Sequence, residues 1–338
     1  MVVHQILSGA GPHDAVTSQA MAFRSLFEEW GWGGHDYAVS IDPRAERRVR
    51  PLGELDAQPG DTLLLHYSAY APKLRRVLGL PNRKVLLSHN VTPAKWFWDY
   101  EPTIAIHCML GRRELPRYAE AADVVAGVSL YNARELGSEE VVPILFDAGA
   151  LGEPGPEPPP GPPTVLFVGR LAPHKRQDEV IRAFALLRRH RVPDARLVLV
   201  GEPLNPNYGD ALRALADDLA PGAVTIESSL SRAALADRYR SAHAFLCLSE
   251  HEGFCIPLLE AFWFGVPVVS RPVGGIPEVA GDAALLVDDP DLAVVAELTA
   301  MAIEDAGLRA TLRARGRGRL AAFEPAATAE KLRALLSS

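Results

Sequence analysis

A stretch rich in Pro and Gly, "DAGALGEPGPEPPPGPPT" at residues 147–164, divides this chain into two segments of similar length. Proline lacks a backbone N–H and glycine loses much conformational entropy on folding, so their density here disfavours both helix and strand. Such a composition is typical of a semi-rigid, extended connector. We therefore expect an N-terminal domain over 1–147, a linker over 148–163 and a C-terminal domain over 164–338.

Each segment alternates short, β-rich apolar runs with longer stretches of Ala, Leu and Arg at helical spacing. This alternation predicts the α/β class, with two Rossmann-like, doubly wound parallel sheets. The expected strands are 2–8, 62–68, 84–90, 123–129 and 141–146 in the first segment, and 164–170, 196–202, 223–228, 242–249, 266–271 and 284–287 in the second. The expected helices include 18–31, capped by Ser18 and ended by Gly31, and 291–303, 307–321 and 326–336 at the end of the chain.

Composition and charge exclude several classes of protein. The chain has 338 residues, of which 48% are hydrophobic, so it can bury sizeable cores. Its formal net charge of −7 argues against a general nucleic-acid binder, which needs basic faces. The 3 cysteines lack metal-binding spacing and are typical of reduced thiols, and neither a signal peptide nor a membrane span of ~20 apolar residues is recognisable. We expect a cytoplasmic protein.

Polar residues that directly follow strands matter most, because open parallel sheets bind ligands at the carboxyl ends of their strands. In "GRLAPHKRQDE", Arg170 and Lys175 lie between an expected strand and an expected helix. Two cations beside a helix N-terminus suit an anion, since the free N–H groups and the helix dipole add to their charge. A solvated basic turn is the alternative interpretation.

Two acids surround a helix start in "EHEGFCIPLLEAFWFGVPVV", residues 250–269. Pro257 suits the first helical position, and this would place Glu260 in the first turn, where the dipole favours its charge. A carboxylate there can accept two hydrogen bonds from the vicinal diol of a ribose, and Glu252 in the preceding loop can bind sugar hydroxyls in the same way. The alternative is a dipole-matched helix acid and a surface loop residue.

Other stretches contain further candidate residues. His89 in "LLSHNVTP" follows a strand and can donate to a hydroxyl or an anion, whereas His66 in "LLLHYS" is better explained as core. Gly9 and Gly11 in "SGAGPHD" form only a fragment of a dinucleotide fingerprint. The glycines of "RPVGGIPE" suit close approach to a ligand or a tight turn. The acids of "DDPD" suit a helix cap, and we expect no metal site, since no metal-binding motif is present.

Several of these stretches together resemble one enzyme family. "EGFCIPLLEAFWFGVPVV" looks like an E-x7-E signature, "VLFVGRLAPHKRQDEVIRAF" like the first strand–loop–helix of the same domain, and "GVPVVSRPVGGIPEVAGDAALLVDDPD" like the segment after the signature. These are features of the retaining family-4 (group 1) glycosyltransferases, which have the GT-B fold of two Rossmann-like domains facing a cleft. In the first segment the likeness is looser, in "LLLHYS", "LLSHNVTP" and "AADVVAGVSLYNARELG".

The resemblance implies a role for each matching residue. Arg170 and Lys175 would bind the diphosphate of a nucleotide sugar, Glu260 the ribose and Glu252 the donor sugar. The remaining donor-binding positions would be Gly9 and Gly11 in a loop facing the diphosphate, and the backbone of Gly253, Phe254, Cys255 and Ile256. The implied catalytic set is His89, Arg170, Lys175 and Glu252, with His89 near the reacting centre. Cys255 departs from the glycine that the family commonly has there.

The implied reaction moves a hexose of the mannose or glucose type, from a donor such as GDP-mannose or UDP-glucose, to a hydroxyl of a glycan, glycolipid or natural product. The resemblance implies retention of anomeric configuration, and neither a metal nor another cofactor, because two cations can stabilise the leaving diphosphate. Arg75 and Arg76 in "KLRRVLGLPNRK" form a small basic patch that suits weak peripheral membrane contact, or simply a solvated surface. A nucleotide-sugar epimerase or hydrolase with the same fold, or a non-catalytic binding subunit, stays open.

Overall fold

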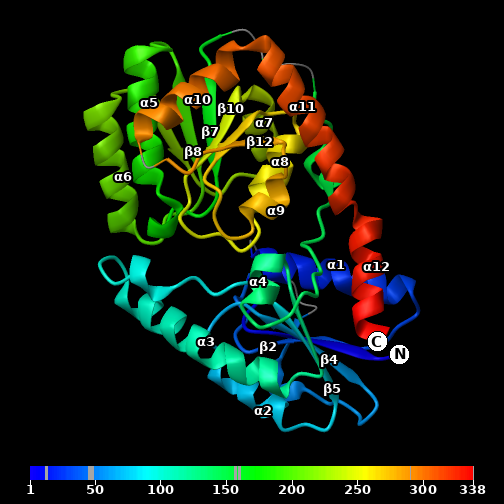
Figure 1. The fold of residues 1–338 in the computed structure, drawn as a ribbon. Helices are drawn as coiled ribbons and strands as arrows, with labels where there is room; N and C mark the ends of the chain where they lie inside the picture. The colour runs from blue at the N-terminus through cyan, green and yellow to red at the C-terminus, as the bar shows by residue number, and fades with distance from the viewer. Residues whose placement is uncertain (12–13, 45–48, 156–157, 159–160, 290, 338) are drawn as a thin grey trace. The chain divides into compact units, whose positions relative to one another are not determined.

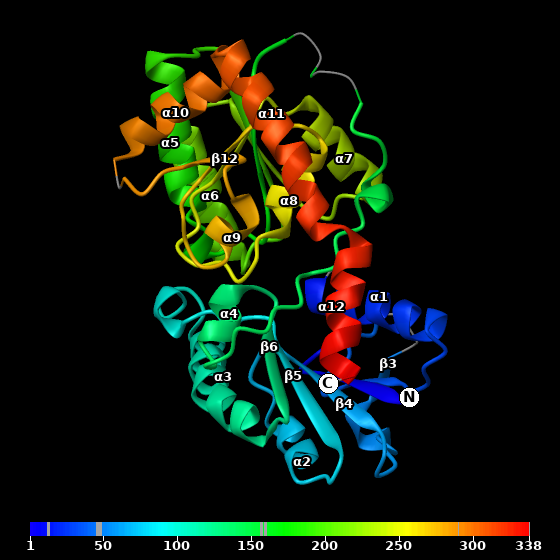
Figure 2. The same cartoon turned by 45° about the vertical axis from the view of Figure 1, so that its right-hand side comes forward.

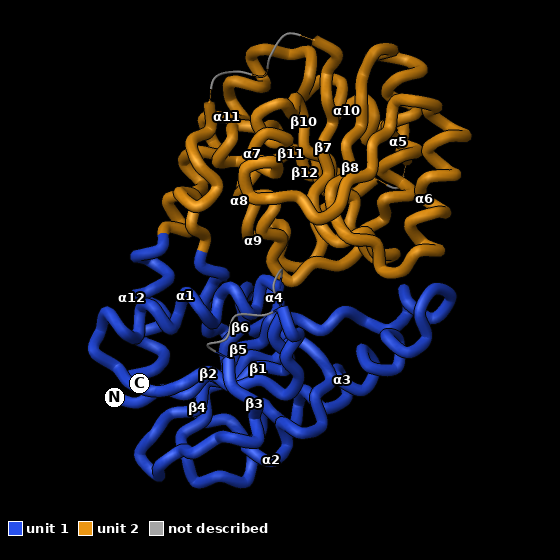
Figure 3. Tube along the Cα trace, turned by 180° about the vertical axis from the view of Figure 1, so that it is seen from behind, with its two compact units in different colours: residues 1–145, 325–338 blue, residues 146–324 orange. Residues whose placement is uncertain are grey.

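The computed structural model describes residues 1–11, 14–44, 49–155, 158, 161–289 and 291–337, and the chain divides into two compact units. Unit 1 comprises Met1–Leu145 together with Pro325–Ser338, and unit 2 comprises Phe146–Glu324 (Figure 3). Each unit contains one six-stranded sheet, and every strand pairing within the described residues is parallel. The expected α/β class with two doubly wound sheets is confirmed.

Unit 1 has the strand order β3-β2-β1-β4-β5-β6. The strands are β1 (Val3–Leu7), β2 (Asp36–Ala38), β3 (Val49–Pro51), β4 (Thr62–Tyr67), β5 (Arg83–Ser88) and β6 (Val124–Gly127). The helices are α1 (Ala15–Glu29), α2 (Arg75–Leu78), α3 (Pro102–Ala121), α4 (Leu130–Arg134) and α12 (Pro325–Ser337). Helices α2 and α3 lie on one face of the sheet and α1 and α12 on the other (Figures 1 and 2).

Unit 2 repeats the same topology, with the order β12-β11-β10-β7-β8-β9. Its strands are β7 (Thr164–Val168), β8 (Arg196–Val200), β9 (Val224–Glu227), β10 (Ala244–Cys247), β11 (Val268–Ser270) and β12 (Ala284–Leu286). Its helices are α5 (Gln177–His190), α6 (Pro206–Leu219), α7 (Arg232–Ser241), α8 (Ile256–Trp263), α9 (Ile276–Ala280), α10 (Leu292–Glu304) and α11 (Ala306–Leu320). Helix α5 packs between α6 and α10 on one face, while α7, α8 and α11 lie on the other (Figures 1 and 2).

Both sheets are buried on two faces, which explains why their strands read as nearly continuous apolar runs. All five residues of β1 and all six of β4 are buried. The core of unit 2 joins the inner faces of β7, β8 and β10 to apolar residues of α5, α6 and α10. These strands therefore form rigid supports for the loops at their carboxyl ends.

The last helix differs from expectation, because α12 belongs to unit 1 although the expected second domain ran to residue 338. Leu332, Leu335 and Leu336 are buried. The Arg83 guanidinium donates to the carbonyl oxygens of Leu336 at 3.0 Å and Leu335 at 3.2 Å, and Arg333 lies over the Trp30 ring at 5.6 Å. An apolar helical stripe predicts that a helix is buried, but not which sheet it covers.

The linker also differs in part. Residues 156–157 and 159–160 lie outside the described residues, but Ala148–Leu151 forms a single 3-10 turn despite the surrounding glycines. Trp263 Nε1 donates to the Gly152 carbonyl at 2.8 Å, and the Arg240 guanidinium donates to the Glu153 carbonyl at 2.8 and 3.0 Å. The first half of the linker is thus packed onto unit 2.

Some local predictions were wrong for identifiable reasons. Helix α1 starts at Ala15 and is capped by Asp14, whose carboxylate accepts from the Thr17 N–H at 2.9 Å, so Ser18 lies inside the helix; Gly31, at φ +71°, does follow its end. The run 141–146 forms only an isolated bridge between Val141 and Gly127. Strands β2 and β3 were missed because three residues are too few to show a period.

Candidate functional site

The best candidate site lies where the strand order of unit 2 reverses. Strands β7 and β10 are hydrogen-bonded neighbours, and the chain continues from them in opposite directions across the sheet. Loops that leave the carboxyl ends of two such strands diverge and leave room for a ligand. Arg170 and Lys175 follow β7, and Glu252 follows β10, so the fold brings three of the predicted site residues to this point.

The central contact is an ion pair between the two loops. Lys175 Nζ lies 2.7 Å from Glu252 Oε1, and the same oxygen accepts from the Ser249 hydroxyl at 2.7 Å. Burial lowers the pKa of Lys175, but the Glu252 carboxylate and the nearby thiols of Cys255 and Cys247 together raise it, so the net pKa lies above its ordinary value and the ammonium stays charged. Glu252 is only 7% exposed, which corrects the alternative interpretation of a surface loop residue.

The loop after β7 holds Lys175 at the end of a 3-10 turn, Pro173–Lys175, immediately before Arg176. Arg176 adopts φ +50°, a left-handed conformation that lets the chain turn into α5. The Arg176 guanidinium forms ion pairs with Asp178, Glu179 and Glu250, which tie the start of α5 to the loop after β10. Lys175 is thus positioned just before a helix start, as the sequence predicted.

Arg170 differs from its basic neighbours, because its side chain is exposed and forms no ion pair with any other described residue. Arg176 is neutralised by three acids, and Arg271, after β11, pairs with Glu179 and donates to the Leu248 carbonyl at 2.9 Å. Lys175 shares its charge with one carboxylate. The positive charge that remains available to an anion therefore comes mainly from Arg170, with Lys175 second.

Glu260 lies elsewhere than expected. Helix α8 begins at Ile256, so Pro257 is its second residue and Glu260 its fifth, beyond the first turn. The Tyr239 hydroxyl, from α7, donates to Glu260 Oε2 at 2.6 Å. Burial raises the pKa of Glu260 and this hydrogen bond opposes the shift, leaving the pKa above its ordinary value. Glu260 is thus fixed by a hydrogen bond from a buried tyrosine, and it lies close to the start of α8.

The backbone between the two acids is unusual. Cys255 adopts φ +76°, which L-residues rarely do, and within the described chain its side chain makes no capping hydrogen bond to α8. The Phe254 side chain packs edge-on against Phe323, with ring centroids 5.6 Å apart. The Phe254 side chain therefore belongs to the core, and the donor-binding role implied for the main chain of Gly253–Ile256 stays a prediction.

The glycine pair 274–275 supports Glu252. Gly274 has φ +57°, and a Cβ there would come within 1.9 Å of the Glu252 carbonyl oxygen. The Gly275 N–H donates to that same oxygen at 3.0 Å. Close approach of backbone to backbone explains these glycines better than contact with a ligand does.

Two thiols and one carboxylate form a cluster that sequence spacing did not predict. Cys247 Sγ, Cys255 Sγ and a Glu252 oxygen all lie within 4.8 Å of one another, and these are the atoms that could hold a metal ion in the described part of the chain. A hydrogen bond from Cys255 lowers the pKa of the Cys247 thiol to about 7, and the same hydrogen bond, in which Cys255 keeps its proton, raises the pKa of Cys255 together with burial. Glu252 is already bonded to Lys175, so an ion here would compete with that pair.

The remaining predicted residues lie in unit 1. His89 directly follows β5, and its Nε2 lies 2.9 Å from Nδ1 of His66, on β4. His66 is fully buried, which confirms its assignment to the core, but the contact with His89 was not foreseen. Gly9 and Gly11 follow β1; a Cβ on Gly9 would come within 3.0 Å of the Ser40 hydroxyl, whereas Gly11 has room for one. Residues 12–13 of this loop lie outside the described residues.

Three residues of the site carried no recognisable signal. Ser249 is the last residue of an apolar run, Tyr239 sits in the polar stretch "ADRYRS", and Arg271 begins a Gly/Pro loop. Only contact in the fold shows that Ser249 binds Glu252, Tyr239 binds Glu260 and Arg271 binds the Leu248 carbonyl. The acids of "DDPD" follow the expected explanation, since the Asp291 carboxylate caps α10 by accepting from the Ala293 N–H at 2.8 Å.

Comparisons with known proteins concern the family of unit 2 and the fold of the chain. Residues 154–319, nearly all of unit 2, match the family model described as glycosyl transferases group 1. The D-inositol 3-phosphate glycosyltransferase of Mycolicibacterium smegmatis is 35% identical over 133 residues, which are 38% of this chain and 30% of the relative. That of Acidothermus cellulolyticus is 38% identical over 156 residues, 44% of this chain and 35% of the relative. The chain thus aligns with about a third of the length of these curated relatives.

Solved structures resemble the whole chain. Sucrose-phosphate synthase from Thermosynechococcus elongatus superposes with a TM-score of 0.77 at 19% identity, covering 99% of this chain and 98% of that one. Anabaena HepE in complex with UDP-glucose gives 0.71 at 17% identity, covering 100% and 99%. At such identities the likeness concerns the fold. This chain thus has the fold of the GT-B glycosyltransferases, and its residues 154–319 match the family model of the glycosyl transferases of group 1.

Proposed function

We propose that this protein is a retaining glycosyltransferase that moves a hexose from a nucleoside-diphosphate sugar to a hydroxyl of a glycan, glycolipid or small natural product. The observation that carries the proposal is the Lys175–Glu252 ion pair beside Arg170 at the reversal point of strands β7 and β10. Two cationic side chains, Arg170 and Lys175, and the Glu252 carboxylate therefore belong to one site. A sugar nucleotide combines the two matching chemistries, an anionic diphosphate and sugar hydroxyls.

Each group has a role in this proposal. Arg170 and Lys175 bind the diphosphate, Glu260 accepts hydrogen bonds from the ribose diol, and Glu252 accepts them from the donor sugar. Glu252 Oε1 already accepts from Lys175 and Ser249, so hydroxyls would meet its second oxygen. The main chain of Gly253–Ile256 lies beside the sugar and phosphates, and in unit 1 His89 serves the sugar near the reacting carbon.

The chemistry follows from the charge that develops. The bond between the anomeric carbon and the phosphate oxygen breaks, a bond to the acceptor oxygen forms on the same face, and the leaving phosphate oxygen takes the acceptor's proton. Negative charge then accumulates on the diphosphate, where fixed cations stabilise it most. Arg170 and the permanently charged Lys175 meet this need, so the proposal includes no metal ion.

The choice of donor follows from one structural relative. A UDP-glucose complex is known for the structural relative HepE, and we propose UDP-glucose first and GDP-mannose second as donors.

No helix in the described parts of the chain is both long and apolar enough to span a membrane. Of the basic patch at 73–84, Arg75 pairs with Glu114 and the Lys84 ammonium donates to the carbonyls of Leu80 and Asn82, so any contact with lipid headgroups would fall to the exposed Lys73 and Arg76.

The first test is a thermal-shift panel of UDP, GDP, ADP and TDP. A nucleotide present at 100 times its Kd stabilises the native state by about 2.7 kcal/mol, so the matched nucleotide alone should raise the Tm clearly. Turnover is then measured with the matching sugar nucleotide, with and without acceptor glycans. Nucleotide release that needs no acceptor would favour the epimerase or hydrolase, and binding without any turnover would favour a non-catalytic subunit.

Two variants test the residue assignments. Glu260→Gln should weaken nucleotide binding roughly 10- to 100-fold, since a bond to a charged group is lost, and Lys175→Ala should lower kcat by about 100-fold or more. Glu227→Gln is the matched control, because Glu227 is also held, by Arg238 at 2.7 Å, but lies on the edge strand β9. If Glu260→Gln and Lys175→Ala both retain full activity, the proposed site is wrong.

A further inference from the structure

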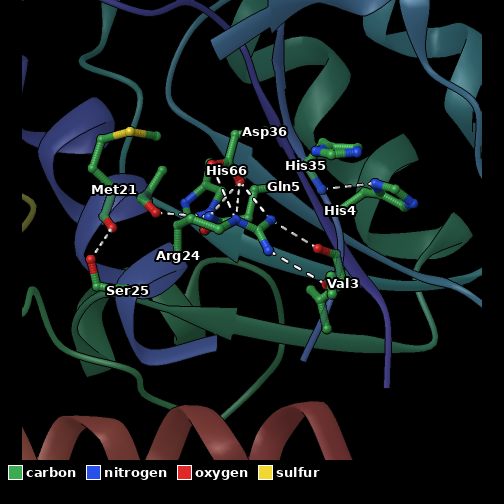
Figure 4. Close-up of polar contacts among 11 residues, drawn as sticks. Val3, His4, Gln5, Met21, Arg24, Ser25, His35, Asp36 and His66 are labelled. Atoms are coloured by element: carbon green, nitrogen blue, oxygen red, sulfur yellow. Dashed lines mark hydrogen bonds and ion pairs between the residues drawn. The ribbon is translucent and has the colours of Figure 1, made fainter. Parts of the chain in front are cut away.

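A buried chain of hydrogen bonds crosses unit 1 and ends at His89. The Arg24 guanidinium donates to the Asp36 carboxylate at 2.7 Å, and the Gln5 amide nitrogen donates to the same carboxylate at 2.8 Å (Figure 4). Gln5 Oε1 lies 2.9 Å from His66 Nε2, and His66 Nδ1 lies 2.9 Å from His89 Nε2. The first four of these residues are all buried, so no bulk water competes for these contacts.

The direction of every bond in this chain follows from groups that can only accept. The Gln5 amide nitrogen also lies 2.7 Å from the Ala20 carbonyl oxygen. A carboxylate and a carbonyl oxygen both accept, so the Gln5 NH₂ group must face them and its Oε1 must face His66. His66 Nε2 therefore carries a hydrogen. If His66 is neutral, its Nδ1 is bare and accepts the hydrogen on His89 Nε2.

The surroundings keep both imidazoles neutral. Burial lowers the pKa of His66 well below its ordinary value, with a further decrease from His89, and burial lowers the pKa of His89 to about 3. The acid in this series of hydrogen bonds, Asp36, is already paired with Arg24 and is separated from His66 by the Gln5 amide. A positively charged His66 would reverse its bond to His89. This series of hydrogen bonds contains no unpaired carboxylate that could stabilise such a charge.

These bonds determine which nitrogen of His89, the last residue of the series, lacks a hydrogen. With its hydrogen on Nε2, neutral His89 has a bare Nδ1, and this atom is buried without a hydrogen-bond partner in the described part of the protein. Such an acceptor is costly to leave unmet, and its partner must come from outside the described chain. A bare nitrogen repels an anion and binds a hydroxyl.

We propose that Gln5 and His66 are positioning residues that hold His89 in its Nε2–H form, so that His89 Nδ1 accepts a hydrogen bond from a hydroxyl of the substrate. This inference rests on the proposed function for the identity of that hydroxyl, as part of the sugar or the acceptor. It reverses the expectation from sequence that His89 donates. Arg24 and Asp36 act one step further back, since they orient the Gln5 amide.

The tautomer can be measured without any activity. In the full chain labelled with ¹⁵N-histidine, the His89 signals are assigned by their loss in His89→Gln, and ring-nitrogen shifts then distinguish a protonated from a bare nitrogen. We expect a protonated Nε2 and a bare Nδ1. Gln5→Met removes the acceptor that holds His66, so His66 and then His89 should shift toward the opposite tautomer. A protonated Nδ1 in the unmutated protein, or a His89 tautomer that Gln5→Met leaves unchanged, overturns the proposal.

A matched control separates positioning from loss of stability. Gln19 is likewise buried in unit 1, on α1, and donates to the Pro143 carbonyl at 3.1 Å without touching the chain to His89. Gln5→Met should lower kcat/KM roughly 5- to 50-fold beyond Gln19→Met, the range expected when a buried bond is lost. Equal values in the two variants refute the contact with the substrate. If turnover is absent in every form while the tautomer is as expected, only the proposed function fails.

Discussion

The hydrogen bond from Tyr239 to Glu260 offers the sharpest test of the electrostatics of the site. Tyr239→Phe removes the hydroxyl that lies 2.6 Å from Glu260 Oε2, and a weaker contact of 3.5 Å with the Pro257 carbonyl. The ring itself should stay in place, because it stacks on Phe264 with centroids 5.4 Å apart and on Phe245 at 6.2 Å. The substitution thus isolates one bond to one carboxyl group.

The magnitude depends on pH, and its sign follows from the pKa of Glu260. Because burial raises that pKa above the ordinary value of about 4.3 for a Glu in an unfolded chain, ionisation of Glu260 costs stability as the pH rises through the folded pKa. The Tyr239 hydroxyl limits this cost. Its loss should lower the free energy of unfolding by about 0.5–1.5 kcal/mol at pH 4, where the carboxyl is neutral, and by about 1.5–3 kcal/mol at pH 8, where it is charged.

The assay is thermal and chemical unfolding of both proteins between pH 4 and pH 8. For a unit of this size, each kcal/mol corresponds to roughly 2–4 °C in Tm, so the loss at pH 8 should be about 3–12 °C. Tyr208→Phe is the matched control: Tyr208 is also buried in unit 2, and its hydroxyl donates at 3.1 Å to Gln177 Oε1, which does not titrate. The control loss should be the same at both pH values. A Tyr239→Phe loss that is equally independent of pH would refute the argument that Glu260 ionises against this bond.

Two further predictions concern the backbone around Glu252. Cys255→Gly should be more stable than Cys255→Ala by about 1 kcal/mol, because both remove the thiol but only glycine is unstrained at φ +76°; equal unfolding midpoints in urea would contradict this. Gly274→Ala should destabilise the protein and weaken nucleotide binding together, since the added Cβ would come within 1.9 Å of the Glu252 carbonyl oxygen. Gly222→Ala, also at positive φ (+70°) but with open space around it, controls for the backbone conformation; the Tm and the nucleotide Kd of both variants decide the point.

The sequence predicted the positions of most strands and the acids and cations at their ends. Long apolar runs such as β4 and β8 are bounded by polar residues, and the positions just after a strand are predictable from that boundary. Lys175 and Glu252 were both found in this way, as residues that follow strands. The three-residue strands β2 and β3 were not found, because a period of two cannot be recognised in so short a run.

Partners in contact were harder to predict than positions. Glu252 and Lys175 are 77 residues apart, Glu260 and Tyr239 are 21 apart, and no periodicity joins them. The sequence placed Glu260 in a first helical turn because Pro257 suits the first position, yet α8 starts one residue earlier, at Ile256, directly after the left-handed Cys255. Glu260 therefore lies beyond the first turn, and a residue of another helix, Tyr239 on α7, holds its carboxyl group.

By itself, therefore, the amino-acid sequence determined the class of the fold and the chemical types gathered at the ends of β7 and β10, since hydrophobic period and loop composition are local properties. The domain bounds expected from the sequence differ from the two units, which divide between Leu145 and Phe146. Tertiary structure decided which sheet α12 covers, which carboxylate each cation neutralises and which nitrogen of His89 carries a hydrogen. These depend on contacts between residues far apart in the chain. The hydrogen on His89 is the clearest case, because it is set by Asp36 and the Ala20 carbonyl through two intervening side chains.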